Sequence, residues 1–94
     1  MSAESAVVRN DDRSRYELVV DGEIVGIADF VVQQDRVVVP HTEISPRLRG
    51  QGMGAQLVRG VLDDIRSSGR TVVPQCWYVA EFLDTHPDYA DLVA

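Results

Sequence analysis

Apolar residues in the first half of the chain form four short runs, which turn-forming residues separate. The runs cover residues 5–9, 15–20, 23–33 and 36–44. In the second run, Tyr16, Leu18 and Val20 share one face at a period of two, as in a half-buried strand. Asp21-Gly22 is a hairpin signal, and Gln34-Asp35 connects the third run to the fourth. Four short strands with short connections predict an antiparallel meander.

The period of the apolar positions changes after Gly52. Apolar side chains then recur every three and four residues, with polar side chains on the other face, which predicts an amphipathic helix over residues 52–68. The apolar positions of this helix are Met53, Leu57, Val58, Val61, Leu62 and Ile65. Ser67-Ser68-Gly69 supplies a stop, because Gly69 readily adopts the left-handed conformation that ends helices.

The rest of the chain predicts smaller elements. Residues 71–73 indicate a buried strand, residues 79–83 a short helix, and residues 87–93 a second short helix that begins at Pro87. The whole pattern predicts an α/β fold of the α+β type, with a mixed, mostly antiparallel sheet of about five strands. We expect the long helix on one face of this sheet and the short C-terminal helices at its end.

Composition and charge narrow the class of protein. The chain of 94 residues is 45% hydrophobic and 26% charged, as in ordinary globular proteins, and its length suits a single domain over residues 1–94. A formal net charge of −6 repels a phosphate backbone, so we expect no nucleic-acid partner. The same acidic surface raises the local concentration of cationic substrates such as amines.

The location of the protein is predicted from signals that the sequence lacks. No apolar stretch approaches the roughly 20 residues that cross a bilayer, so we expect no membrane partner. Met1-Ser2-Ala3-Glu4-Ser5 shows no basic region followed by an apolar run, as a secretory signal would. Cys76 is the one cysteine and has no internal disulfide partner. These features favour a cytoplasmic protein.

Three glycines lie after the fourth predicted strand and at the start of the long helix, in Arg49-Gly50-Gln51-Gly52-Met53-Gly54-Ala55, which we call the glycine turn. A helix N-terminus presents unpaired N–H groups and a partial positive charge that bind phosphate, and glycine lets the phosphate approach the backbone. The P-loop motif is excluded because the chain has no lysine. The dinucleotide-binding fingerprint is excluded because no acidic residue ends its second strand.

Within this turn, Arg49-x-x-Gly52-x-Gly54 resembles the pyrophosphate-binding motif of the GNAT acetyltransferase superfamily, Gln/Arg-x-x-Gly-x-Gly/Ala. From Tyr16 onward the chain is similar to the Yjdj-type minimal N-acetyltransferase-like domains. The segments that carry this wider resemblance are His41-Thr42-Glu43, Pro74-Gln75-Cys76-x-Tyr78-Val79 and His86-Pro87-x-Tyr89. The resemblance implies a GNAT-like fold, acetyl-coenzyme A as co-substrate and transfer of an acetyl group to an amine.

The resemblance also implies roles for particular residues. The backbone N–H groups of the glycine turn hold the pyrophosphate of coenzyme A, and the edge of the preceding strand pairs with the pantetheine arm. Tyr78 is a candidate acid for the departing thiol, although a place in the core, beside Trp77, is the simpler expectation for it. The implied coenzyme A-binding residues are Ile44, Ser45, Arg49, Gly50, Gln51, Gly52, Met53, Gly54, Ala55 and Tyr78.

Three side chains are candidates for the chemistry. His41 suits removal of a proton from an ammonium acceptor, because imidazole is the commonest general base in proteins, and Glu43 is the alternate base. Cys76 either lines the thioester pocket or accepts the acetyl group covalently, with His41 as its base. We expect no metal site, because His41, Cys76 and His86 lack a recognisable ligand spacing.

Two functions from different classes are consistent with these residues. The first is an N-acetyltransferase in which the amine attacks the thioester directly within a ternary complex. The second is a non-catalytic module that binds or senses coenzyme A, because the 94 residues hold no counterpart of the N-terminal helices that usually shape an acceptor pocket in GNAT enzymes. We favour the enzyme.

Overall fold

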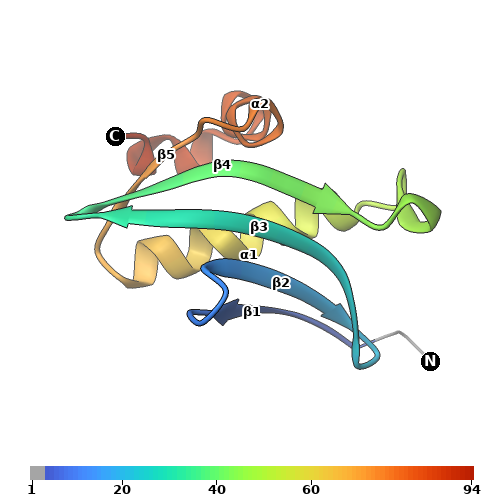
Figure 1. Cartoon of the computed structure of the whole chain (residues 1–94). Helices are drawn as coiled ribbons and strands as arrows, with labels where there is room; N and C mark the ends of the chain where they lie inside the picture. Colours follow the sequence, from blue (N-terminus) through green and yellow to red (C-terminus); the bar gives the residue numbers. More distant parts are fainter. Residues whose placement is uncertain (1–3) are drawn as a thin grey trace.

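The computed structural model describes residues 4–94, so Met1, Ser2 and Ala3, part of the segment considered for a secretory signal, lie outside the described residues. Five strands, two α-helices and two 3₁₀ helices follow one another in this range (Figure 1). They are β1 (Ser5–Asn10), β2 (Arg15–Val20), β3 (Glu23–Gln33), β4 (Arg36–Ile44), η1 (Pro46–Leu48), α1 (Met53–Ser67), β5 (Thr71–Val73), α2 (Trp77–Thr85) and η2 (Pro87–Leu92).

The strands form one sheet in the order β1-β2-β3-β4-β5. Each of the first four strands is antiparallel to its neighbour, and β5 is parallel to β4, as the βαβ path through α1 requires. The predicted hairpin at Asp21-Gly22 is present, with φ of 50° and 80° at its two residues. Positive φ at both positions is the type I′ geometry that matches the twist of a two-residue hairpin. The predicted meander and mixed sheet are confirmed.

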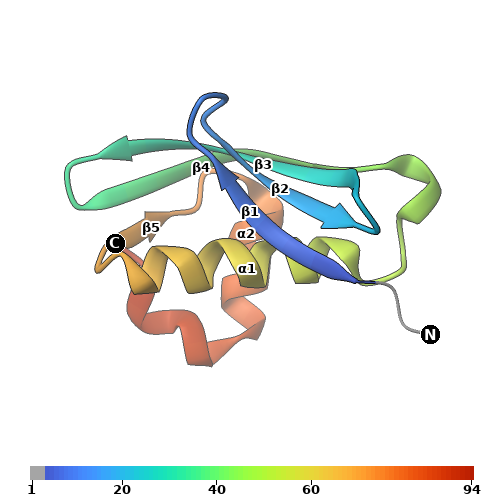
Figure 2. The same cartoon turned by 90° about the horizontal axis from the view of Figure 1, so that it is seen from below.

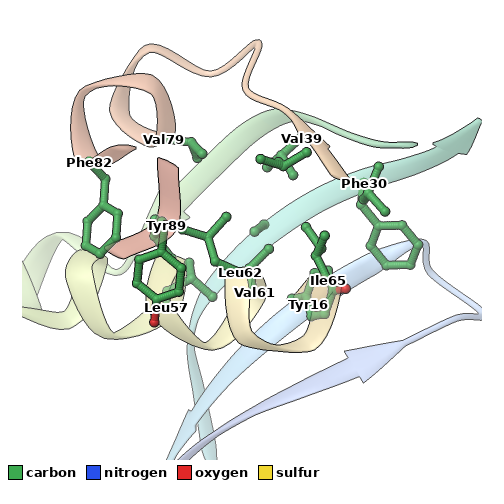
Figure 3. Close-up of a cluster of buried hydrophobic side chains, with 14 of the residues drawn as sticks. Tyr16, Phe30, Val39, Leu57, Val61, Leu62, Ile65, Val79, Phe82 and Tyr89 are labelled. Carbon is green, nitrogen blue, oxygen red and sulfur yellow. The ribbon is translucent and has the colours of Figure 1, made fainter. Parts of the chain in front are cut away.

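One face of the sheet is covered by α1, and α2 and η2 pack beside α1 (Figures 1 and 2). The predicted apolar stripe of the helix is confirmed, because the buried residues of α1 are Leu57, Val58, Val61, Leu62 and Ile65. Burial of each such side chain contributes about 1.5–3 kcal/mol. Figure 3 shows the labelled α1 residues in one cluster, with Phe82 and Tyr89 at one end and Phe30 at the other.

Two tyrosines tie the core to the polar side of α1. The Tyr16 hydroxyl donates a 2.7 Å hydrogen bond to Asp64, and the Tyr89 hydroxyl donates one of the same length to Asp63. Burial raises the pKa of Tyr16, and the bond to Asp64 raises it further, because both disfavour a phenolate. These bonds connect α1 to β2 through Tyr16 and to η2 through Tyr89.

The C-terminal elements differ in detail from the prediction. Helix α2 begins at Trp77, two residues earlier than expected, and the last element is a 3₁₀ helix. The expected core position of Trp77 is wrong, since its relative exposure is 73%. Val79, Phe82 and Leu83 take the core-facing side of α2 at spacings of three and four, which places Trp77 on the opposite side. No helix within residues 4–94 is long and apolar enough to cross a membrane.

Candidate active site

The two central strands of the site, β4 and β5, separate after three residue pairs. Val38 pairs with Val73, and beyond this point each strand carries a proline, Pro40 and Pro74. Proline has no N–H to donate, so the parallel ladder cannot continue through these positions. The last connection is the Cys76 N–H, which donates to the Val39 carbonyl at 3.0 Å. From there β4 runs on to Ile44 with an open edge.

A cleft of about 850 Å³ occupies the opening between β4 and the start of α2, and we call it the β4/β5 cleft. This volume lies in the range of pockets that bind small molecules and cofactors. Its lining residues are Pro40, His41, Thr42, Glu43, Ile44, Leu48, Arg49, Gly50, Gly52, Met53, Gly54, Leu57, Gln75, Cys76, Trp77 and Tyr78. The cleft therefore joins the glycine turn to the predicted catalytic residues.

The glycine turn forms one end of the cleft. Gly50 and Gly52 both have φ of 79°, a left-handed conformation that favours glycine, and Gly52 is the residue that caps α1. The first hydrogen bond of α1 runs from the Gln56 N–H to the Gly52 carbonyl. The N–H groups of Met53, Gly54 and Ala55 therefore have no partner within the helix, and the positive end of the helix dipole lies beside the cleft.

Gly54 has a different reason for being glycine. A Cβ atom at this position would lie 2.6 Å from the Tyr78 hydroxyl oxygen, closer than real contacts allow. Tyr78 comes from α2 and is half-buried, with its ring packed against the core and its hydroxyl beside the start of α1. Tyr78 therefore lies in the cleft rather than inside the core, which favours its predicted contact with coenzyme A over the simpler core expectation.

Successive residues of β4 alternate between the two faces of the sheet. Thr42 pairs with Ala28, which is buried on the helix-covered face, so Thr42 lies on that face as well. His41 pairs with Asp29, and its ring lies 3.6 Å from Glu43 on the opposite face. The structure thus separates His41 and Glu43 from the face of Thr42, and this placement counts against His41 as the base for Cys76.

The Cys76 thiol lies directly before the first turn of α2, where it is partly buried. Strand β5 ends at Val73, and Cys76 is the N-cap residue of α2. Burial raises the pKa of this thiol, but the Thr42 side chain and the backbone N–H groups of Val79, Tyr78 and Thr42 lower the pKa by more, and the result is a pKa below the ordinary value.

The edge of β4 offers unpaired backbone groups to the cleft. The Ser45 N–H donates to the Val25 carbonyl at 2.8 Å, so the backbone of Ser45 faces β3. Because successive residues of a strand alternate in direction, the backbone groups of Thr42 and Ile44 face the open edge. Of the ten predicted binding residues, Ser45, Gln51 and Ala55 do not line the cleft, and the other seven do.

Several lining residues were not among the sequence-based candidates. Leu48 and Leu57 provide apolar surface, while Thr42, Gln75 and Trp77 provide polar or aromatic groups. The position of Thr42 depends on a register shift between β3 and β4 after Asp29, which no sequence pattern marks. His86 is the C-cap residue of α2, stacks on Phe82 with ring centroids 3.7 Å apart and does not line the cleft.

Charge in the cleft is mixed. Arg49 is exposed and makes no ion pair within residues 4–94, whereas the other arginine near the turn, Arg47, is paired with Glu23. No group of three or more His, Cys, Asp or Glu side chains in this described range has the arrangement of a metal site. The cleft therefore combines a cationic end at the glycine turn with His41, Glu43 and a thiol at the other.

The arrangement has counterparts among known proteins. The family model for GCN5-related N-acetyl-transferases matches residues 15–92. The chain belongs to this family. The resemblance based on Arg49-x-x-Gly52-x-Gly54 is thereby confirmed at the level of the GNAT superfamily, and the chain is an acetyltransferase by family. No curated protein matches it significantly.

Two solved structures share this GCN5-related fold. One is a GCN5-like protein from Staphylococcus aureus, described as an N-acetyltransferase, with a TM-score of 0.72 and 19% identity over 95% of this chain and 87% of that chain. The other is the ribosomal-protein-S18-alanine N-acetyltransferase from Escherichia coli, with a TM-score of 0.60 and 20% identity over 68% of this chain and 43% of that one. At these identities the likeness shows the fold alone, and the fold class is confirmed.

Proposed function

We propose that this chain binds acetyl-coenzyme A in the β4/β5 cleft and transfers the acetyl group to an amine. The observation that carries the proposal is the continuity of the cleft, which runs from the free N–H groups of the glycine turn along the open edge of β4 to Cys76. A linear ligand with an anionic end and a reactive far end matches this order of groups. Membership in the acetyltransferase family supports the same ligand.

The glycine turn is suited to the pyrophosphate. The unpaired N–H groups of Met53, Gly54 and Ala55 donate to phosphate oxygens, and the helix dipole favours the negative charge. Open space surrounds the position where a Cβ would stand on Gly50 or Gly52, so phosphate has access to the backbone. Arg49 adds a side-chain cation at the same end of the cleft.

The open edge of β4 is suited to the pantetheine arm. This arm carries two amide groups, and the backbone N–H and C=O groups of Thr42 and Ile44 pair with amides as a further strand would. Such pairing directs the thioester toward Pro40 and Cys76, where β4 and β5 separate. The order of groups in the cleft therefore places the acetyl group farthest from the glycine turn.

For the transfer itself, we propose direct attack of the amine within a ternary complex. The nitrogen forms a bond to the thioester carbonyl carbon, the carbon–sulfur bond breaks, and coenzyme A leaves as a thiolate. His41 or Glu43 takes the proton of the ammonium acceptor through water, because both lie on the solvent-exposed face of β4. The Tyr78 hydroxyl gives a proton to the leaving thiolate and regains, through water, the second proton that the nitrogen loses as the amide forms. Glu43 and the net acidic surface attract a cationic acceptor.

The experiment that tests this function is release of free thiol from acetyl-coenzyme A with a panel of small amines and peptides. The proposal predicts release that depends on both the protein and the amine. Calorimetric binding of acetyl-coenzyme A without amine-dependent release would support a coenzyme A-binding module instead. Absence of binding would contradict both functions.

A covalent route is a second candidate, and one observation favours it. The lowered pKa of Cys76 makes its thiolate more populated at neutral pH, and a thiolate is able to attack the thioester carbon and release coenzyme A thiolate. The acetyl group would then pass from sulfur to the amine. His41 lies on the opposite face of β4, so the base for this route would have to be water.

A further inference from the structure

Cys76 has one direct side-chain hydrogen-bond partner within residues 4–94, the Thr42 hydroxyl, at 3.4 Å from its sulfur. The two residues are far apart in sequence and meet beyond the point where the pairing of β4 with β5 ends. The Cys76 side chain makes no capping hydrogen bond to α2, so the N–H groups of that helix act on the sulfur as nearby dipoles. The Thr42 hydroxyl is therefore the group that contacts the sulfur directly.

The direction of this hydrogen bond follows from the surroundings of the sulfur. A threonine hydroxyl donates more strongly than a thiol, and the sulfur faces the positive ends of the first N–H dipoles of α2. Both effects favour negative charge on sulfur, with the hydrogen on the Thr42 oxygen. The contact is partly buried, which reduces competition from water.

Thr42 is also well placed to keep its hydroxyl on the sulfur. A β-branched side chain has few χ1 rotamers, and Thr42 stands on the helix-covered face of β4, opposite the buried Ala28. The ionisable residues around the cleft are Tyr78 on α2, His41 and Glu43 on β4 and Arg49 in the glycine turn. Residues of α1 that line the cleft are uncharged, so hydroxyl and backbone donors, rather than a cation, surround the sulfur.

We propose that Thr42 is a positioning residue of the β4/β5 cleft, whose hydroxyl donates to the Cys76 sulfur, fixes its direction and favours its thiolate form. The contact itself is a property of the free protein. Its use beside the thioester rests on the proposed function. In direct transfer the fixed sulfur shapes the acetyl pocket, and in the covalent route it is the attacking atom.

The test is the pH dependence of Cys76 alkylation by iodoacetamide, which reports on a single thiol because the chain has one cysteine. Thr42→Val keeps the shape of the side chain and removes the hydroxyl. We expect the alkylation midpoint to rise by about one pH unit and the rate at pH 7 to fall about three- to tenfold. Thr42→Ser keeps the hydroxyl and should restore the wild-type midpoint.

Thr71→Val is the matched control, because Thr71 is a strand residue of β5 that does not line the cleft. Its midpoint should equal that of the wild type. An unchanged midpoint in Thr42→Val, or equal rises in the valine and serine variants, would overturn the proposal. A wild-type midpoint at or above the ordinary cysteine value of about 8.5 would overturn it without any variant.

Binding of acetyl-coenzyme A to the wild-type protein, measured by calorimetry, separates this proposal from the proposed function. Alkylation that responds to Thr42 as expected, with no binding of acetyl-coenzyme A, would contradict the proposed function and support the role of Thr42 in holding the sulfur. Binding of acetyl-coenzyme A, together with an alkylation midpoint that does not change in Thr42→Val, would contradict the positioning role of Thr42. The proposed ligand would still be supported.

Discussion

The Tyr78 hydroxyl occupies the space beside Gly54, at a position 2.6 Å from where a Cβ on that glycine would lie. This close approach brings the first turn of α2 against the first turn of α1, and so connects the two sides of the β4/β5 cleft. It also assigns Gly54 a packing role that its place in the glycine motif does not suggest. The motif therefore combines glycines with two different physical requirements.

The first prediction concerns the fit of Gly54 against Tyr78. Gly54→Ala should lower the free energy of unfolding by about 1–3 kcal/mol, because the methyl group displaces the tyrosine. In a Tyr78→Ala background the same change should be neutral or stabilising, since alanine favours a helix over glycine by about 1 kcal/mol. Urea denaturation of the four proteins measures this coupling. An equal cost in both backgrounds would show that Tyr78 is not the obstacle.

The second prediction separates backbone strain from ligand binding at Gly52. Gly52→Val should lower stability, because φ is 79° there, and should weaken acetyl-coenzyme A binding about tenfold or more, because a side chain then fills the space for phosphate. Gly69→Val is the matched control, since Gly69 has φ of 75° and open space at the other end of α1.

Both valine variants should lose similar stability, about 1–2 kcal/mol, and only Gly52→Val should lose affinity in calorimetry. Unchanged affinity in a folded Gly52→Val protein would remove the glycine turn from the binding site. Equal loss of affinity in both variants would assign the effect to general destabilisation instead.

The sequence predicted the elements of this fold well, because their signals are local. The period-two pattern of Tyr16, Leu18 and Val20, the turn at Asp21-Gly22 and the stripe of α1 all depend on near neighbours. The predicted start of α2 was two residues too late, since its first residue, Trp77, is apolar and yet lies on the side away from the core.

The site was predictable only where a motif marks it. Arg49-x-x-Gly52-x-Gly54 identified the family and one end of the cleft. The motif does not reveal that Gly54 is required for packing against Tyr78, whereas Gly52 has a left-handed backbone conformation. Which residues of β4 face Cys76 depends on the register shift between β3 and β4. The pairing of Thr42 with Cys76 was beyond the sequence for that reason.

The third prediction concerns the role of Cys76 in transfer. Direct attack predicts that Cys76→Ala keeps most of the amine-dependent thiol release, within about threefold of wild type, because the thiol only shapes the pocket. Mass spectrometry of the wild-type protein with acetyl-coenzyme A should then detect no acetyl adduct on Cys76 that reacts with the amine. An adduct that disappears on addition of amine, with turnover lost in Cys76→Ala, would replace direct attack by the covalent route.

The fourth prediction concerns stability at alkaline pH. The pKa of Tyr16 is raised in the folded protein, so its contribution to stability is fully present below the unfolded value of about 10 and is lost as pH rises toward the folded pKa. Stability should therefore decline above about pH 10. Tyr16→Phe should lose about 1–2 kcal/mol at pH 7 and show a smaller alkaline decline.

Tyr78→Phe is the control for this effect, because it removes a hydroxyl but leaves the bond between Tyr16 and Asp64 in place. Its alkaline decline should match that of the wild type in denaturation experiments at pH 7 and above pH 10. A decline of the same size in Tyr16→Phe would assign the alkaline sensitivity to another group.

Binding of acetyl-coenzyme A in the β4/β5 cleft is tested by titrating the ¹⁵N-labelled protein with this ligand and following the amide chemical shifts. Binding in the β4/β5 cleft predicts saturable shifts in three segments that line it: the glycine turn, the open edge of β4 at Thr42 and Ile44, and the start of α2 at Cys76 and Tyr78. Amides of β1 and β2, which do not line it, should stay in place. Shifts confined to other surfaces, or no shifts at millimolar ligand, would contradict binding in the cleft.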